Sequence, residues 1–293
     1  MSNKRRWISS FAALLQEHPT RVLTRDDFEK GLLPQRAAAG VPTGLGASRL
    51  IKVLSEEAGL RQIQVHREGR TGSIDTKTRY AFGAVSAYAV GVSLVKDAYL
   101  THASAMFLHA LTDQIPRTVY VNREQSPKPR PSLPLSQPAI NRAFKRAPRE
   151  STYVFTSEDA RFVLLSGKNT GRLEVAPMRT PQEELVDTTK LERTLIDIVV
   201  RPVYAGGPHE VMRAYETAAS RISMNTLIAT LKRLDYVYPY HQAIGFLLQK
   251  VGVPEPQLAK LEALGLEWDF YLAHQISDPL YDSRWRLFYP QGL

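Results

Sequence analysis

The chain has 293 residues, of which 43% are hydrophobic and 23% are charged, a balance typical of a folded protein with a substantial core. It contains no cysteine, which excludes a disulfide framework and any thiolate metal site. No run of about 18 apolar residues occurs, and no secretory signal pattern follows the basic stretch 1–6. We therefore expect a cytoplasmic protein of two domains with no membrane partner.

The formal net charge is +9, and most of the excess lies near the N-terminus. Residues 1–82 carry 14 Lys and Arg against 8 Asp and Glu, a net +6, so the rest of the chain contributes only +3. A basic excess concentrated in a small region favours a polyanionic partner such as nucleic acid. Positive charge also serves solubility, and charge alone leaves that alternative open.

Residues 1–58 carry the patterns of three helices, expected over 4–17, 24–33 and 46–58. The second opens with the capping-box pattern Thr24-Arg25-Asp26-Asp27, in which side-chain oxygens satisfy the free amides of the first turn. The third ends before Gly59, a helix-stopping residue. Its buried stripe is expected to comprise Leu50, Val53 and Leu54.

Two strands are predicted next, at 60–66 and 74–82, separated by a turn that contains two glycines. Three helices followed by a hairpin is the element order of a winged helix-turn-helix. We therefore predict an α+β chain in which residues 1–84 form a winged helix-turn-helix DNA-binding domain and residues 85–293 form a mixed α/β domain.

The third predicted helix has the polarity of a DNA-recognition helix. Arg49 and Lys52 lie in its first half, whereas the acidic Glu56 and Glu57 lie at its C-terminal end. Such a helix inserts its N-terminal part into the major groove, where Arg and Lys reach purine edges and phosphates. Basic residues around the hairpin turn suit contacts with phosphate or the minor groove. The candidate DNA-binding residues are Ser48, Arg49, Lys52, His66, Arg67, Arg70, Lys77 and Arg79.

Residues 85–293 alternate between helix and strand patterns. In 98–121 we expect a helix capped by Thr101, followed by a strand after Pro116. A helix over 190–200 carries Arg193, Asp197 and Arg201 at i, i+4 spacing, which predicts a ladder of ion pairs along the edge opposite its buried stripe. Further strands are expected at 152–156, 161–166, 173–178 and 285–289, with a turn at 167–171 joining the second and third. Further helices are expected at 208–219, 224–234, 239–251 and 257–264.

The sequence offers no catalytic motif. A restriction-type nuclease needs an Asp followed by Glu-x-Lys, and no Glu-x-Lys occurs. The zinc-protease, serine-hydrolase and phosphate-loop motifs are missing as well. His102 and His109 lie two helical turns apart, too far to share a metal, so we expect buried, hydrogen-bonded histidines, with no cofactor and no metal.

Several segments of the second domain occur in the order found in a known bacterial family. They are Tyr99-Leu100-Thr101-His102-Ala103-Ser104-Ala105, Leu111-Thr112-Asp113-Gln114-Ile115-Pro116, Leu191-Glu192-Arg193-Thr194-Leu195-Ile196-Asp197 with Arg201-Pro202 and Ala205-Gly206-Gly207, and Gly245-Phe246-Leu247-Leu248. In this order they resemble the AbiEi antitoxin family, which are transcriptional regulators linked to phage defence. The resemblance covers residues 85–290, and the N-terminal domain is similar by type rather than by motif.

The resemblance implies a repressor that binds the promoter DNA of its own two-gene toxin–antitoxin operon. It also implies that the C-terminal domain counteracts a nucleotidyltransferase-like toxin, the arrangement called type IV, with or without direct contact. It supplies no catalytic residue. Two alternatives stay open: a nucleic-acid-processing enzyme with an unrecognised C-terminal active site, and an interaction module that does not bind DNA.

Overall fold

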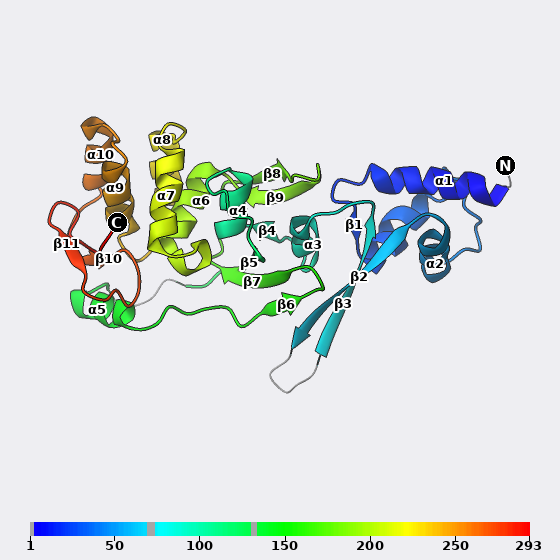
Figure 1. Cartoon of the computed structure of the whole chain (residues 1–293), viewed down its shortest axis with the longest axis horizontal. Coiled ribbons are helices and arrows are strands. Elements are labelled where there is room, and N and C mark those ends of the chain that lie inside the picture. The colour runs from blue at the N-terminus through cyan, green and yellow to red at the C-terminus, as the bar shows by residue number, and fades with distance from the viewer. Residues whose placement is uncertain (1–2, 69–73, 130–133) are drawn as a thin grey trace.

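The computed structural model describes residues 3–68, 74–129 and 134–293. Helices surround a large curled sheet in a mixed α/β architecture, and the N-terminal helices lie at the opposite end of the molecule from the last helices of the chain (Figure 1). None of the described helices combines the length and apolar character needed to cross a membrane.

The N-terminal elements keep the predicted order of helical segments and hairpin. They are α1 (Asn3–Gln16), β1 (Val22–Leu23), the π-helix η1 (Asp27–Leu32), the short helix η2 (Leu33–Gln35), α2 (Ala47–Glu57), β2 (Leu60–Glu68) and β3 (Ile74–Phe82). The short strand β1, which was not predicted, lies between the first two helical segments and pairs with β3, and the second helical segment is a π-helix. The capping box is confirmed, since the Thr24 amide donates to the Asp27 carboxylate over 2.7 Å and the Asp27 amide donates to the Thr24 hydroxyl over 3.2 Å. The buried stripe of α2 needs one correction: Leu50, Ile51 and Leu54 are buried, whereas Val53 is half-buried.

The remaining elements build the larger part of the molecule. They are α3 (Ala87–Ser93), β4 (Tyr99–Leu100), α4 (His102–Leu108), β5 (Thr118–Glu124), α5 (Gln137–Lys145), β6 (Val154–Thr156), β7 (Arg161–Gly167), β8 (Val175–Arg179), β9 (Leu185–Thr189), α6 (Leu191–Val200), η3 (Pro202–Ala205), α7 (Pro208–Ala218), α8 (Met224–Leu234), α9 (Tyr240–Lys250), α10 (Glu255–Glu262), β10 (Phe270–Tyr271), β11 (Leu280–Asp282) and β12 (Leu287–Tyr289).

Two predictions about these elements are wrong. The segment 167–171 does not close a hairpin, because β7 pairs with β5 and β6 while β8 pairs with β9, a strand that the sequence patterns did not indicate. Thr101 precedes α4 but does not cap it, because its hydroxyl donates instead to the Asp197 carboxylate on α6 over 3.1 Å. The Thr101 hydroxyl therefore binds a distant carboxylate instead of a main-chain amide in the first turn of α4.

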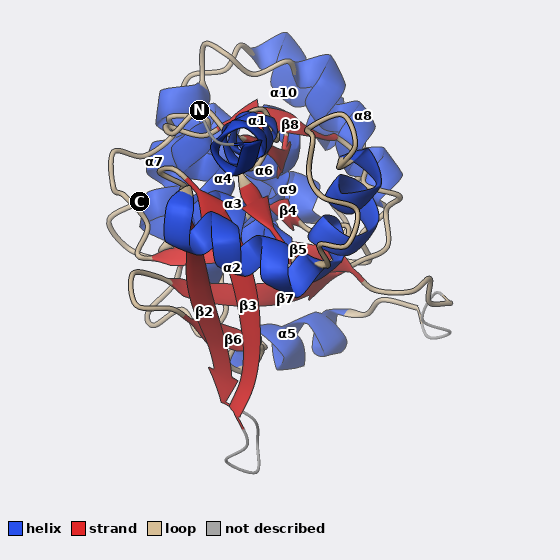
Figure 2. Ribbon diagram, turned by 90° about the vertical axis from the view of Figure 1, so that its right-hand side faces the viewer, coloured by secondary structure: helices blue, strands red, loops and turns tan. Residues whose placement is uncertain are grey.

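In the described part of the chain, nine strands form one sheet that runs through both the N-terminal and the larger part, in the order β1-β3-β2-β6-β7-β5-β4-β9-β8. Strands β5 and β7 lie parallel, with Thr118 opposite Arg161. The N-terminal hairpin joins this sheet where His66 on β2 pairs with Thr156 on β6. Figure 2 shows the hairpin extending away from the body of the molecule beyond this junction.

A hydrophobic core also spans the two parts of the chain. Val22 and Val65, from the first 84 residues, pack in one cluster with Val90, Leu100 and Val119. Separate clusters lie under α1 and α2 and among the C-terminal helices. The division into domains at residue 84 stays a prediction.

The C-terminal helices explain one motif of the family resemblance. Gly245 on α9 lies directly against the indole ring of Trp285, which is fully buried, and any larger side chain at 245 would overlap that ring. Trp285 in turn donates from its indole nitrogen to Gln249 over 2.7 Å. The glycine of Gly245-Phe246-Leu247-Leu248 thus permits close packing.

Candidate nucleic-acid interface

Helix α2 packs against one face of the β2–β3 hairpin. In an antiparallel pair, residues opposite each other share a face, and the pair Leu60–Phe82 contributes to the same core as Leu50 and Leu54 of α2. Farther out along this face, the side chains become polar: the pairs are Gln62–Tyr80, Gln64–Thr78 and His66–Thr76. Figure 2 shows α2 lying across the root of the hairpin, and side chains from both elements line one hollow.

A hollow of about 460 Å³ lies between α2 and the hairpin, lined by Arg25, Ser48, Ile51, Lys52, Ser55, Glu56, Gln62 and Tyr80. The guanidinium of Arg25 bridges its rim, donating over 2.8 Å to the Ser48 hydroxyl and over 2.8 Å to the Glu29 carboxylate. The hydrogen bond and charge of Glu29 raise the pKa of Arg25, so the guanidinium remains fully charged.

The two predicted basic residues of α2 are both exposed but differ in their partners. The Lys52 ammonium lies 3.9 Å from the carboxylate of Glu56, one turn later. Arg49 has no hydrogen bond or ion pair with any residue that the structure describes. Of the two cations of α2, Arg49 is therefore the one whose charged group is free to bind a ligand without first breaking an ion pair.

The predicted hairpin residues are divided between its two faces. His66 is exposed on the face that α2 borders, with its Nδ1 2.9 Å from the Thr76 hydroxyl. Lys77 is half-buried on the other face, opposite Val65. Arg67 also lies on that other face, where its guanidinium carbon stands 3.6 Å from the ring centre of Tyr153. Arg70 lies outside the described residues.

The prediction of a DNA contact is wrong for Arg79. Its side chain is buried, and its guanidinium donates to the main-chain oxygens of Ser93, Leu94 and Thr78. Burial lowers the pKa of this guanidinium, and the distant charge of Asp27 opposes the shift. Arg79 therefore fixes β3 to the end of α3 and cannot reach a ligand at the surface.

Arg25 is a member of this surface that the sequence patterns missed. It follows the capping residue Thr24, so its local pattern indicates only a helix start. Packing of η1 beside α2 brings it to Ser48, 23 residues later in the chain. Gln62 and Gln64 were missed as well, because a polar residue alternating along a strand indicates exposure and nothing more specific.

The ion-pair ladder predicted on α6 is buried rather than exposed. The side chains of Arg193 and Asp197 are 5% and 7% exposed, and their atoms Nε and Oδ1 lie 2.8 Å apart. Arg193 also donates to the main-chain oxygen of Leu173 over 3.0 Å. Arg201 leaves the ladder and donates to the main-chain oxygen of Arg149 over 2.9 Å.

The two histidines of α4 and its C-terminal end are buried or half-buried and hydrogen-bonded, as predicted. His109 lies 2.7 Å from the main-chain oxygen of Thr189. Burial lowers the pKa of His102 to about 4, with the charges of Arg201 and Arg193 acting in the same direction and Asp197 opposing them. His102 is therefore neutral at physiological pH.

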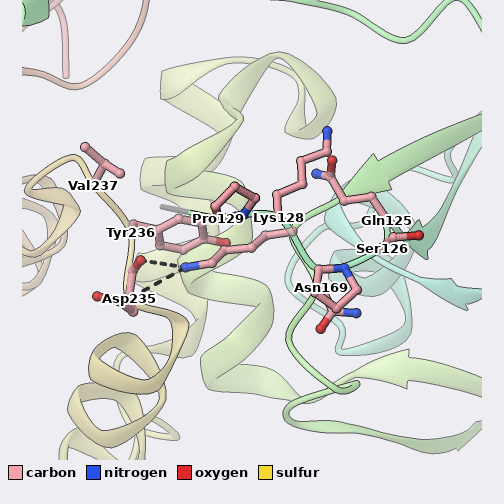
Figure 3. Close-up of a pocket in the computed structure, with 10 residues that line it drawn as sticks. Gln125, Ser126, Lys128, Pro129, Asn169, Asp235, Tyr236 and Val237 are labelled. Atoms are coloured by element: carbon pink, nitrogen blue, oxygen red, sulfur yellow. Dashed lines mark hydrogen bonds and ion pairs between the residues drawn. The ribbon is translucent and has the colours of Figure 1, made fainter. Parts of the chain in front are cut away.

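A separate pocket of about 540 Å³ lies far from α2, between segments 125–129, 168–169 and 235–237 (Figure 3). Lys168 lines this pocket, and its ammonium donates to the main-chain oxygens of Leu234 over 2.7 Å and Asp235 over 2.6 Å. The same ammonium stands 5.8 Å from the ring centre of Tyr236. Lys168 therefore serves to hold the protein's own segments together at this pocket.

No protein-family model and no curated protein sequence matches this chain. Among solved structures, the chain is similar to that of the RV2827C protein from Mycobacterium tuberculosis. The two share 17% sequence identity with a TM-score of 0.55, over 97% of this chain and 91% of that one. At this level of identity the likeness establishes a shared mixed α/β fold and nothing about activity.

Proposed function

We propose that this chain is a transcriptional regulator that binds double-stranded DNA through a winged helix-turn-helix formed by residues 1–84. The observation that carries the proposal is the exposed first half of α2, where Arg49 is unpaired among the described residues beside the polar face of the hairpin. Helix α2 is the recognition helix, and the β2–β3 hairpin is the wing.

The residues of this surface divide by the part of DNA that each suits. Arg49, early on α2, has the planar fork that binds the O6 and N7 acceptors of guanine. Lys52 and Arg25 flank it and suit backbone phosphates, with Ser48 holding Arg25 in place. His66 and Arg70 belong to the wing, which contacts phosphate or the minor groove.

The antitoxin part of the proposal rests on the family resemblance of residues 85–293. In this proposal the chain represses its own operon, and the C-terminal part neutralises the product of a neighbouring nucleotidyltransferase-like gene. A double variant, Arg49→Ala with Lys52→Ala, separates the two activities. It should abolish repression yet still protect cells from the toxin at an equal protein level. Loss of protection at that level would contradict the division of labour.

DNA binding is tested directly with the full chain. Fluorescence anisotropy measures its affinity for the DNA upstream of its own gene and for a scrambled duplex, at several salt concentrations. The affinity should fall steeply with salt, because phosphate contacts release counterions. Arg49→Ala should cost about 1–3 kcal/mol on the upstream DNA and little on the scrambled duplex.

The matched control is Arg233→Ala, which removes an exposed arginine from α8, at the other end of the molecule (Figure 1). It should leave both affinities unchanged. Equal losses for Arg49→Ala on both duplexes would remove its role in reading bases. Equal losses for the two variants would mean that net charge alone explains binding.

A further inference from the structure

A second polar pocket, with a volume of about 260 Å³, lies in the larger part of the molecule. Its floor is formed by the C-terminal ends of the parallel strands β5 and β7, through Asn122, Ser166 and Gly167. Ligands of α/β proteins commonly bind beyond the carboxyl ends of parallel strands. The other lining residues that matter are His102, Arg149, Arg201 and Tyr204.

The protonation of His102 follows from its hydrogen bonds. The Thr101 hydroxyl has one proton, and it donates this proton to the Asp197 carboxylate over 3.1 Å, since a carboxylate held by Arg193 can only accept. The same hydroxyl lies 3.0 Å from His102 Nδ1, so it accepts there and Nδ1 carries the hydrogen. Nε2 of a neutral imidazole is then an acceptor with a free lone pair.

No described residue forms a hydrogen bond with this acceptor. His102 is 8% exposed, and its Nε2 is buried without a hydrogen bond among the described residues. An unsatisfied buried polar atom costs free energy and is rare in native structures. The backbone at His102 also has φ +50, a left-handed conformation uncommon for residues with a side chain. Both features indicate a function beyond packing.

The charges around the pocket favour an anion. Two basic residues, Arg149 and Arg201, line it against one acidic residue, Glu150, and the Arg201 guanidinium uses one of its nitrogens to donate to the Arg149 main-chain oxygen over 2.9 Å. Arg201 lies near enough to His102 for its charge to act on the imidazole. The side-chain amide of Asn122 is partly engaged: its oxygen accepts from the Gly167 amide, and its nitrogen donates one of its two hydrogens to the Tyr99 hydroxyl. The two cations and the acceptor Nε2 of His102 are the groups that would distinguish one anion from another.

We propose that this pocket binds a small ligand that combines an oxyanion with a neighbouring hydrogen-bond donor, as hydrogen phosphate and phosphate monoesters do. Arg149 and Arg201 hold the oxyanion, and Nε2 of His102 accepts from the donor. The chain Arg193–Asp197–Thr101–His102 fixes the imidazole in the tautomer that this requires. Tyr204, whose ring stands edge-on at 5.4 Å from the imidazole, forms one wall.

Phosphate and sulfate provide matched probes for the full chain. At about pH 8, where His102 is neutral, both are dianions of similar shape, but hydrogen phosphate has one P–OH donor and sulfate has none. Calorimetric titration should show that phosphate binds about tenfold more tightly than sulfate, the value of one hydrogen bond to a charged group. Equal affinities, or no binding of either anion, would overturn the proposal.

Two variants and one control locate the effect. His102→Asn keeps a group at the Nδ1 position and suits the left-handed backbone, but removes Nε2, so the preference for phosphate should vanish while sulfate binding persists. Arg149 is exposed, and Arg149→Gln should weaken the binding of both anions by about tenfold. Arg233→Gln, on α8, should change neither. An unchanged preference in His102→Asn, or unchanged affinities in Arg149→Gln, would place binding elsewhere.

The tautomer has an independent readout. A two-bond nitrogen–proton NMR spectrum of the folded chain distinguishes a protonated Nδ1 from a protonated Nε2. We expect His102 to carry its hydrogen on Nδ1, and its Nε2 signal to shift when phosphate is added but not when sulfate is added. A hydrogen on Nε2 in the free protein would contradict the proposed acceptor.

Discussion

Helices α2 and α6 carry the same sequence feature and use it in opposite ways. Each places a cation four residues before an acid: Lys52 before Glu56, and Arg193 before Asp197. The first pair lies on the surface at 3.9 Å with both side chains more than half exposed, whereas the second is buried at 2.8 Å. Local spacing therefore does not determine whether an ion pair lies in the interior or on the surface; the surroundings of the helix do.

The largest expected effect is on the buried pair. Arg193→Ala leaves Asp197 buried without its partner, which should lower the free energy of unfolding by about 3–5 kcal/mol. Urea unfolding monitored by circular dichroism measures this. The matched surface variant, Glu56→Ala, should show no measurable change. A loss below about 1 kcal/mol for Arg193→Ala would mean that the pair is hydrated and the contrast with α2 is false.

The buried His102 should make the free energy of unfolding depend on pH, because burial lowers its pKa. The pKa of His102 is about 4 in the folded protein and 6.5 when unperturbed, so between these values the unfolded chain binds a proton that the folded chain does not. The stabilisation is therefore complete above pH 6.5 and is lost as the pH falls to about 4, by up to about 3 kcal/mol.

Urea unfolding across this pH range tests the assignment. His102→Asn should flatten the dependence, because the titrating group is gone. The other histidines with burial-lowered pKa values, His18, His109 and His241, contribute in the same direction and remain in the variant. An unchanged slope in His102→Asn would assign the acid sensitivity to those three.

Substitution of Arg79 should affect stability, as for Arg193, rather than DNA binding, as for Arg49, although Arg79 lies on the proposed wing. Arg79→Met should destabilise the protein by about 1–3 kcal/mol, because main-chain oxygens at the end of α3 lose their donor. The salt dependence of DNA binding should not change, since this guanidinium does not face the surface. A shallower salt dependence with unchanged stability would restore Arg79 as a DNA contact.

The smallest effect is expected at Lys52. Lys52→Ala should leave the unfolding transition where it is and reduce the slope of log affinity against log salt by about one, the signature of a lost phosphate contact. Fluorescence anisotropy measures the affinity for both duplexes, and the two affinities should fall by the same factor. Weakening confined to the upstream DNA would make Lys52 a base reader beside Arg49.

The spacing of apolar residues predicted most helices and the N-terminal hairpin. In a helix, residues three or four positions apart share a face, and in a strand residues two positions apart do, so these patterns are local in the sequence. The strand pairing of the larger part was not predictable in this way. Strand β7 pairs with β5, about 40 residues earlier in the chain. Strand β9 is only five residues long, and buried and exposed side chains do not alternate regularly along it. Local patterns contain no information about such partners.

The candidate surface was predictable only in part, for the same reason. Arg49 and Arg79 look alike as basic residues in amphipathic segments, but tertiary packing exposes one and buries the other. Arg25 joins the surface through a contact 23 residues distant. The acceptor at His102 depends on Asp197, 95 residues away, and on a single hydroxyl proton that no spacing rule reveals.

The core shared by the two parts of the chain has a practical consequence for fragments. Val22 and Val65 are covered by residues that follow position 84, among them Val90, Leu100 and Val119. A piece ending at residue 84 would turn these side chains to water, together with the edge of β2 that meets β6. Exposed apolar patches and unpaired strand edges promote aggregation. The N-terminal region is therefore best studied through substitutions in the intact chain, because excision would create a surface that the protein itself never displays.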